Sequence, residues 1–166
     1  SGKPVGKSAA PLKVSGRVGI SVDAYDRNRV KGRAYSPYAI KVIADGKDFF
    51  ETRYETWGYI DQEIWSVQYD YDPSGKRRFF RAYNPTPSQI PFFSEADAGM
   101  FNALPAGQHE ISVVVSDAAG NASSVSFKID HALQSDPSRR PWPYGGGDTV
   151  VENGKTVRFG GDAFFE

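Results

Sequence analysis

The stretch VVVSDAAGNASSVSFKID, residues 113–130, predicts two antiparallel strands joined by a short turn. Apolar and polar residues alternate on both sides of the turn, which is the period of a strand with one buried face. Ser124, Ser126 and Lys128 fall on the solvent side of the second strand. The residues that we expect to face the core are Ile111, Val113, Val115, Val125, Phe127 and Ile129.

The turn itself, Asp117-Ala118-Ala119-Gly120-Asn121, allows two interpretations. As a plain turn, Asp accepts hydrogen bonds from the loop amides, Gly adopts a positive φ, and Asn tolerates the left-handed region. As a metal loop, the same side chains offer oxygen ligands to calcium. We expect the plain turn. If the loops hold calcium, the candidates are Asp23, Asp26 and Asp117, because a sandwich can bring strand ends together.

Similar alternation recurs along the chain. Val18, Ile20 and Val22 predict a half-buried strand, and Asp45-Gly46 predicts a tight hairpin between two further strands. Residues 59–71 are ambiguous because their apolar residues fit both a strand and one helical face. A short helix is favoured there. The predicted fold is therefore an all-β, antiparallel, immunoglobulin-like sandwich with at most one short helix.

Composition divides the chain into four parts. Residues 1–11 are small and polar and predict a flexible lead-in, and residues 12–133 form the predicted sandwich. Residues 134–148 are rich in Pro and Gly and predict a linker. Residues 149–166 contain a hairpin that either begins a following β-domain or adds strands to the main one. We expect the chain to be part of a longer protein.

Charge and residue counts exclude several function classes. Lys plus Arg and Asp plus Glu both number 20, and this balance argues against a nucleic-acid or anionic-membrane surface. The chain has no cysteine and two histidines, neither in a zinc-binding pattern, and it has no G-x-S-x-G motif. We therefore predict no catalytic residue, no enzymatic activity and no cofactor in this chain, with calcium at the three candidate aspartates named above as the one alternative.

The segment beginning at Asp70 resembles a calcium loop only at its start. Asp70, Asp72 and Ser74 have the spacing of the first ligands of an EF-hand loop. Its twelfth position, where a bidentate carboxylate is needed, is Arg81. A cation at that position excludes a calcium loop of this type.

Aromatic residues make up 14% of the chain, and many lie in its middle third. Such rings can stack on sugar faces or anchor a partner, and they can equally fill a sandwich core. Core packing is the favoured interpretation. If a ligand is bound, the candidate residues are Trp57, Tyr59, Trp65 and Tyr69.

Three segments, SGRVGISVDAYDR, YAIKVIADGKDFFETRYETW and LPAGQHEISVVVSDAAGNASSVSFKI, resemble a known β-sandwich region. That region follows the catalytic domain in bacterial lysostaphin-like zinc endopeptidases, which cleave peptide cross-links of cell-wall peptidoglycan. The resemblance covers roughly residues 12–130. The zinc motifs of the family, His-x-x-x-Asp and His-x-His, do not occur here, so no catalytic residue carries over to this sequence.

The resemblance implies a non-catalytic accessory module of a bacterial cell-envelope protein, located in the periplasm or outside the cell. Its partner would be a neighbouring catalytic domain that it positions or regulates, with cell-wall glycan or peptide as a further partner. Two alternatives stay open: a carbohydrate- or cell-wall-binding module that uses exposed aromatic residues, and an immunoglobulin-like spacer of an adhesin.

Overall fold

The computed structural model describes residues 10–16, 18–27, 34–55, 68–71, 78–84 and 99–132, and the backbone of 149–152, 155–161 and 164–165. Its elements, in chain order, are β1 (Leu12–Ser15), β2 (Val18–Asp23), β3 (Asp26–Arg27), β4 (Ala34–Tyr35), β5 (Ala39–Ala44), β6 (Lys47–Arg53), β7 (Tyr69–Tyr71), β8 (Arg78–Arg81), η3 (Phe101–Ala103), β9 (Gly107–Ser116), β10 (Ala122–Ala132), β11 (Thr149–Glu152), β12 (Lys155–Gly161) and β13 (Phe164–Phe165).

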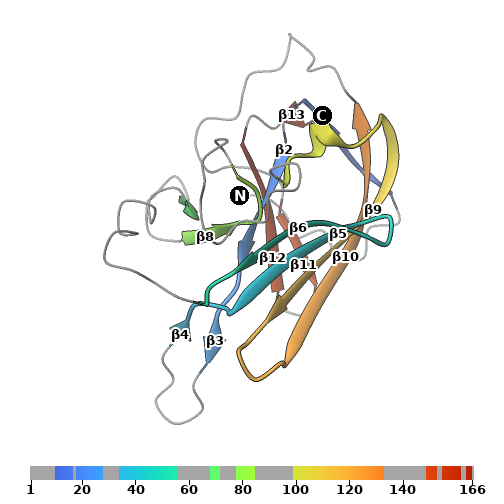
Figure 1. The fold of residues 1–166 in the computed structure, drawn as a ribbon. Helices are drawn as coiled ribbons and strands as arrows, with labels where there is room; N and C mark the ends of the chain where they lie inside the picture. Colours follow the sequence, from blue (N-terminus) through green and yellow to red (C-terminus); the bar gives the residue numbers. More distant parts are fainter. Residues whose placement is uncertain are drawn as a thin grey trace.

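Two sheets pack face to face and form a sandwich-like fold (Figure 1). One sheet has the order β13-β1-β10-β9-β5-β6, the other has the order β11-β12-β2-β8-β7, and β3 and β4 form a separate ribbon. The prediction of an all-β protein is confirmed. The prediction of a purely antiparallel sandwich is wrong at one place, because β1 runs parallel to β10.

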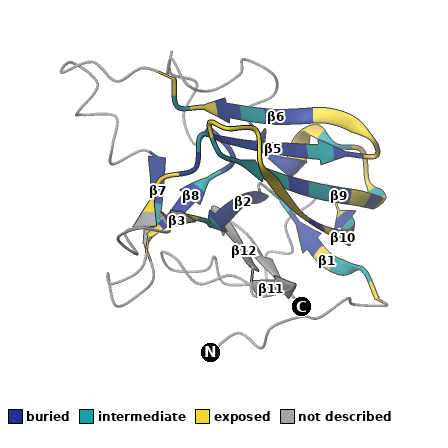
Figure 2. Ribbon diagram, turned by 90° about the horizontal axis from the view of Figure 1, so that it is seen from below, coloured by how far each residue is buried: buried dark blue, intermediate teal, exposed yellow. Residues whose placement is uncertain are grey.

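The β9–β10 hairpin forms the centre of the first sheet, with Val113 opposite Val125. Buried residues alternate with less buried ones along the parts of both strands that pack on the core, as the burial colours of the ribbon show (Figure 2). The core joins residues of both sheets, because Ile111 and Ile129 from the hairpin belong to the same buried cluster as Ile20 of β2. Burial of these aliphatic side chains is the main stabilising contribution to such a fold.

Strand β2 departs from the sequence-based expectation of a half-buried strand. Val18, Ile20 and Val22 face the core as predicted, but Gly19 and Ser21 on the opposite side are buried too. The reason is that other side chains cover the outer face of β2, as described below for the polar cluster. Between β1 and β2 lies Gly16 with φ 78°, a conformation that suits glycine where the chain passes from one sheet to the other.

The β5–β6 hairpin has the tight turn that its sequence predicts. Asp45 and Gly46 both have positive φ, 50° and 76°, as a type I′ turn requires. A bulge shifts the register so that Val42 pairs with Phe50 while Ile43 pairs with Asp48. The extra residue, Phe49, allows two consecutive phenylalanines of β6 to be buried.

The helix favoured over residues 59–71 is wrong for the part that the structure describes. Tyr69–Tyr71 forms strand β7, which pairs with β8, and the Tyr69 ring lies 4.9 Å from the ring of Phe80 in the core. Cross-strand packing of these two aromatic rings stabilises the extended conformation. Residues 59–67 lie outside the described residues. The described part of the chain contains one helical element with three or more residues, the 3₁₀ turn η3.

The strands near the C-terminus belong to the two sheets described above: β11 and β12 to the five-stranded sheet, and β13 to the six-stranded sheet. β12 pairs with β2 over six residue pairs, from Thr156 opposite Asp23 to Gly161 opposite Val18, and β13 pairs with β1. The hairpin of residues 149–161 therefore extends the five-stranded sheet. Most of the predicted lead-in (1–11) and the whole predicted linker (134–148) lie outside the described residues.

In the described part of the chain, no helix has the length and apolar character needed to cross a membrane.

Candidate functional site

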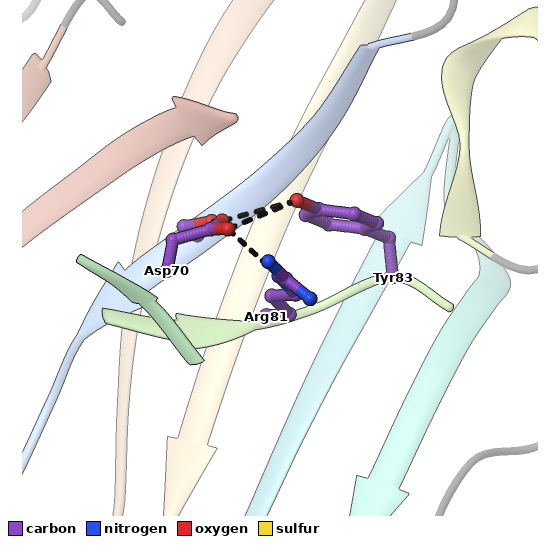
Figure 3. A network of polar contacts seen from close by, with 4 residues as sticks. Asp70, Arg81 and Tyr83 are labelled. Atoms are coloured by element: carbon purple, nitrogen blue, oxygen red, sulfur yellow. Dashed lines mark hydrogen bonds and ion pairs between the residues drawn. The ribbon is translucent and has the colours of Figure 1, made fainter. Parts of the chain in front are cut away.

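A polar cluster occupies the outer face of the five-stranded sheet and consists of Ser21, Asp70, Arg81 and Tyr83 (Figure 3). Ser21 belongs to β2, Asp70 to β7 and Arg81 to β8, while Tyr83 lies two residues after the end of β8. Ser21 lies opposite Arg81 in the ladder. We call this group the Asp70 cluster.

The Asp70 carboxylate is the centre of the cluster. The Nε of Arg81 lies 2.7 Å from Oδ1, and the hydroxyl of Tyr83 donates to Oδ2 over 3.0 Å. The Ser21 hydroxyl donates to Oδ2 as well. One carboxylate thereby connects three strands. β7 carries the carboxylate, β2 contributes the Ser21 contact, and β8 contributes the Arg81 contact.

The alternation of β2, β7 and β8 places these side chains together. Val22, Tyr69 and Phe80 face the core, so their neighbours Ser21, Asp70 and Arg81 point to the opposite face. Tyr83 covers this face next to Gly19, where the missing side chain leaves space for its ring. This packing explains why the outer side of β2 is buried.

The cluster has little contact with solvent. The side chains of Asp70 and Arg81 are 15% and 21% exposed, and Ser21 and Tyr83 are buried. Burial, together with the neighbouring negative charge of Asp70, raises the pKa of the Tyr83 phenol far above its usual range. Tyr83 therefore stays protonated and acts as a hydrogen-bond donor at all physiological pH values.

Two arginines also lie against aromatic rings of this sheet. The guanidinium carbon of Arg78 is 5.0 Å from the centroid of the Tyr69 ring, and that of Arg81 is 5.8 Å from the Tyr83 ring. These distances are typical of cation–π contacts. Arg81 thus contacts both the carboxylate and the aromatic ring of the cluster, which fixes the position of its planar group.

Chemically, the arrangement suits a structural connection. A nucleophilic serine needs a base that can accept its proton, and here Ser21 donates to a carboxylate that also receives contacts from Arg81 and Tyr83. The Asp70 carboxylate thus accepts from three different side chains. These contacts hold β2, β7 and the end of β8 together.

The β9–β10 turn has the plain-turn geometry. Oδ1 of Asp117 accepts hydrogen bonds from the amides of Ala119 and Asn121, both over 2.9 Å, and Oδ2 accepts one from the Asn121 side chain over 2.7 Å. These bonds, led by the Asn121 side chain, lower the pKa of Asp117. Gly120 has φ 87°, as expected for this position.

The other calcium candidates do not complete a site in the described residues. Asp23 ends β2, and Asp26 begins β3 with only its backbone described. The described residues contain no group of three or more His, Cys, Asp or Glu side chains arranged to hold a metal ion. The carboxylate of Asp117 is engaged by its own turn.

Of the predicted ligand-binding aromatic residues, only Tyr69 is described, and it is 2% exposed. Its ring is part of the core, because the period-two alternation of β7 turns it inward. Trp57, Tyr59 and Trp65 lie outside the described residues. Sequence reasoning missed the two large exposed aromatic side chains of the described part, Tyr25 and Tyr35.

Tyr25 and Tyr35 lie at the ribbon formed by β3 and β4, which extends from one end of the sandwich (Figure 1). They are 52% and 49% exposed. In the ribbon, Tyr35 pairs with Asp26, the residue that follows Tyr25. The sequence offers a weak indication of this surface, because both tyrosines flank a polar loop rich in Arg, Asn and Gly.

Comparisons of the chain with protein-family models, with curated proteins and with solved structures found no match. The fold and the cluster define an all-β protein with two packed sheets and a buried polar connection on the outer face of one of them.

Proposed function

We propose that this chain is a non-catalytic, immunoglobulin-like β-sandwich module of a bacterial cell-envelope protein. It acts beside the catalytic domain of a zinc endopeptidase that cleaves peptidoglycan, in the periplasm or outside the cell. Its role is to position or regulate that domain, which is its partner in the parent chain, and cell-wall glycan or peptide is a further partner.

The Asp70 cluster is the observation that supports a non-catalytic role most directly. It joins an acid, a hydroxyl and a phenol, which are the groups that catalysis uses. The hydroxyl and the phenol both donate to the acid, which Arg81 contacts as well, and the side chains are largely buried. The polar chemistry of this face thus serves the packing of the sheet.

The association with a peptidase rests on the three sequence segments that resemble the lysostaphin-like family. The parent gene tests it. We expect His-x-x-x-Asp and His-x-His motifs to be encoded upstream of this chain. A parent protein made of repeated copies of this module, without those motifs, would refute the association and favour the adhesin spacer.

The regulatory role is tested by comparing the full parent protein with a deletion variant that lacks residues 12–133. Both are assayed for release of new amino groups from cross-linked peptidoglycan. We expect the rate of cross-link cleavage, or the amount of enzyme bound to the wall, to change at least severalfold. Equal cleavage and equal binding of the two proteins would contradict the role.

The exposed pair Tyr25 and Tyr35 favours one second candidate, a glycan-binding module. Aromatic rings stack on the apolar faces of sugars, and a neutral ligand suits a chain with no net charge. Binding to purified peptidoglycan should weaken about tenfold in Tyr25→Ala or Tyr35→Ala, the loss of about 1.4 kcal/mol of stacking. Tyr25→Phe is the control, because it keeps the ring.

Trp57→Ala and Trp65→Ala extend the same binding assay to the residues predicted from sequence. Binding that is absent in the wild-type chain, or that is unaffected by all four alanine variants, would remove the glycan-binding candidate.

A further inference from the structure

Two buried histidines contact one carbonyl oxygen at the end of the sandwich closed by residues 99–106. Nε2 of His109 lies 2.9 Å from the carbonyl oxygen of Pro105, and Nδ1 of His131 lies 3.3 Å from the same atom. His109 opposes Ile129 and His131 opposes Gly107 in the β9–β10 ladder, so both rings lie on the inner face of the hairpin.

The second nitrogen of His109 contacts a carboxylate. Its Nδ1 lies 2.7 Å from Oδ2 of Asp45, in the turn between β5 and β6. Both ring nitrogens therefore face oxygens that can only accept hydrogen bonds. A neutral imidazole has one N–H and one lone pair, so it can satisfy only one of them. The doubly protonated ring satisfies both.

We propose that His109 is a pH-sensitive tie. As an imidazolium it holds Asp45 and the Pro105 carbonyl together, and when it loses its proton to solvent it releases one of them. This inference is independent of the proposed accessory role. It assigns to His109 the closure of one end of the sandwich.

The tie connects two regions that lie far apart in the sequence, the β5–β6 turn with Asp45 and the segment with Pro105. Asp45 also accepts the amide of Glu110 over 2.9 Å, and its own amide donates to the Glu110 carbonyl over 2.9 Å, so the β5–β6 turn is fixed to β9. Pro105 follows η3, whose Phe101 is fully buried in the core and lies 5.9 Å from the ring of Phe49. His109 connects these two regions.

The surrounding charges favour the protonated ring. From the β5–β6 turn, Asp45 faces it directly, and Lys47 at the start of β6 acts on Asp45. From β10, His131 shares the Pro105 oxygen, and from β9 Glu110 contacts Asp45 through its backbone. Residues 99–106 contain no titratable side chain. Asp45 is therefore the one carboxylate among the described residues that contacts the His109 ring.

The electrostatic consequences agree with the geometry. The hydrogen bond that His109 donates to the Asp45 carboxylate raises the pKa of His109 in spite of the burial of the ring, which is 7% exposed. The same contact lowers the pKa of Asp45. A group with a raised pKa in the folded state stabilises that state fully below its unfolded pKa, and this stabilisation is lost as the pH rises through the folded value.

The test is a pH titration of the histidine ring protons by NMR on the whole chain, with the two histidines distinguished by a His131→Gln variant. We expect His109 to titrate above its ordinary pKa of 6.5. Asp45→Asn should return it toward that value, and Asn also tolerates the positive φ of this position. Asp48→Asn is the control, because it removes a carboxylate of the same hairpin that binds Lys41 instead.

The structural consequence is measured by urea unfolding and by hydrogen exchange. The unfolding constant of the wild-type chain should increase by up to about tenfold per pH unit in the window between the two pKa values of His109, and Asp45→Asn should flatten this slope. The amide of Leu104, which donates to the Phe101 carbonyl, should lose protection over the same window after correction for intrinsic exchange.

Three results would overturn the inference. They are a His109 ring that titrates at or below its ordinary value, identical titrations in Asp45→Asn and Asp48→Asn, and protection of Leu104 that stays constant while the ring loses its proton.

Discussion

The ring of Tyr83 lies directly on the backbone of Gly19. A Cβ atom at Gly19 would stand 2.4 Å from Cδ1 of that ring, which is far inside van der Waals contact. Gly19 and the Tyr83 ring therefore form a single packing unit on the outer face of β2, because the ring occupies the space that a side chain at Gly19 would need. This unit positions the Tyr83 hydroxyl for its bond to Asp70.

Gly19→Ala should destabilise the protein by about 2 kcal/mol, because overpacking of a buried site forces the ring to move. The free energy of unfolding in urea measures this effect. In a Tyr83→Ala background the same substitution should cost less than half as much, since the clashing ring is gone. Equal costs in the two backgrounds would show that the ring is not the cause.

Asp70→Ala should lower the free energy of unfolding by about 3 kcal/mol, because it removes the carboxylate that Arg81, Ser21 and Tyr83 all contact in a largely buried site. Glu51→Ala is the matched control. The Nε of its partner Arg53 lies 2.5 Å from Oε1 of Glu51, but the Arg53 side chain is mostly exposed. Loss of such a surface pair should cost much less than loss of the Asp70 contacts. Similar losses in the two variants would contradict a structural role for the cluster.

Asp117→Ala should lower the urea concentration at the midpoint of unfolding, because the carboxylate accepts hydrogen bonds from its own turn much as an N-cap residue does. The pKa of Asp117 is lowered in the folded state. Its contribution is therefore complete above the ordinary value of 3.8 and is lost as the pH falls below that value.

Unfolding curves between pH 2 and pH 6 test this, with Asp117→Asn expected to remove that part of the pH dependence. Calcium should leave the melting temperature of the wild-type chain unchanged. A calcium-dependent increase that Asp117→Asn abolishes would restore the metal interpretation of this turn.

Phe101→Ala should destabilise by about 3 to 5 kcal/mol, since a fully buried ring is replaced by a cavity. Asn102→Ala in the same 3₁₀ turn is the control, because Asn102 is exposed, and its cost should stay below about 0.5 kcal/mol. Thermal melting of both variants makes the comparison. A small effect of Phe101→Ala would mean that the end of the sandwich is not closed by this residue.

Local patterning was sufficient to predict the hairpins. The alternation around Val113 and Val125 and the Asp45-Gly46 turn each depend on neighbours in sequence, and both appear in the structure as expected. Tyr69 was misjudged because its segment fits two periods equally well. Only its pairing with Phe80, a contact between residues distant in sequence, distinguishes strand from helix.

The Asp70 cluster could not be predicted for the same physical reason. In the sequence, Asp70 and Arg81 stand at positions one and twelve of a segment that resembles a calcium loop but lacks its last ligand. The structure pairs the two residues across β7 and β8, and it adds Ser21 from a strand 49 residues away. Pairwise register between strands carries this information, and hydrophobic alternation does not specify which strands become neighbours.

The non-catalytic role is tested most directly by a hydrolysis assay of the purified chain on cross-linked peptidoglycan. The Asp70→Asn variant is assayed in parallel, at a temperature where both proteins are folded. The account predicts no release of new amino groups above the buffer blank by either protein, and a lower free energy of unfolding for Asp70→Asn. Release of amino groups by the wild-type chain that a folded Asp70→Asn variant no longer shows would contradict it.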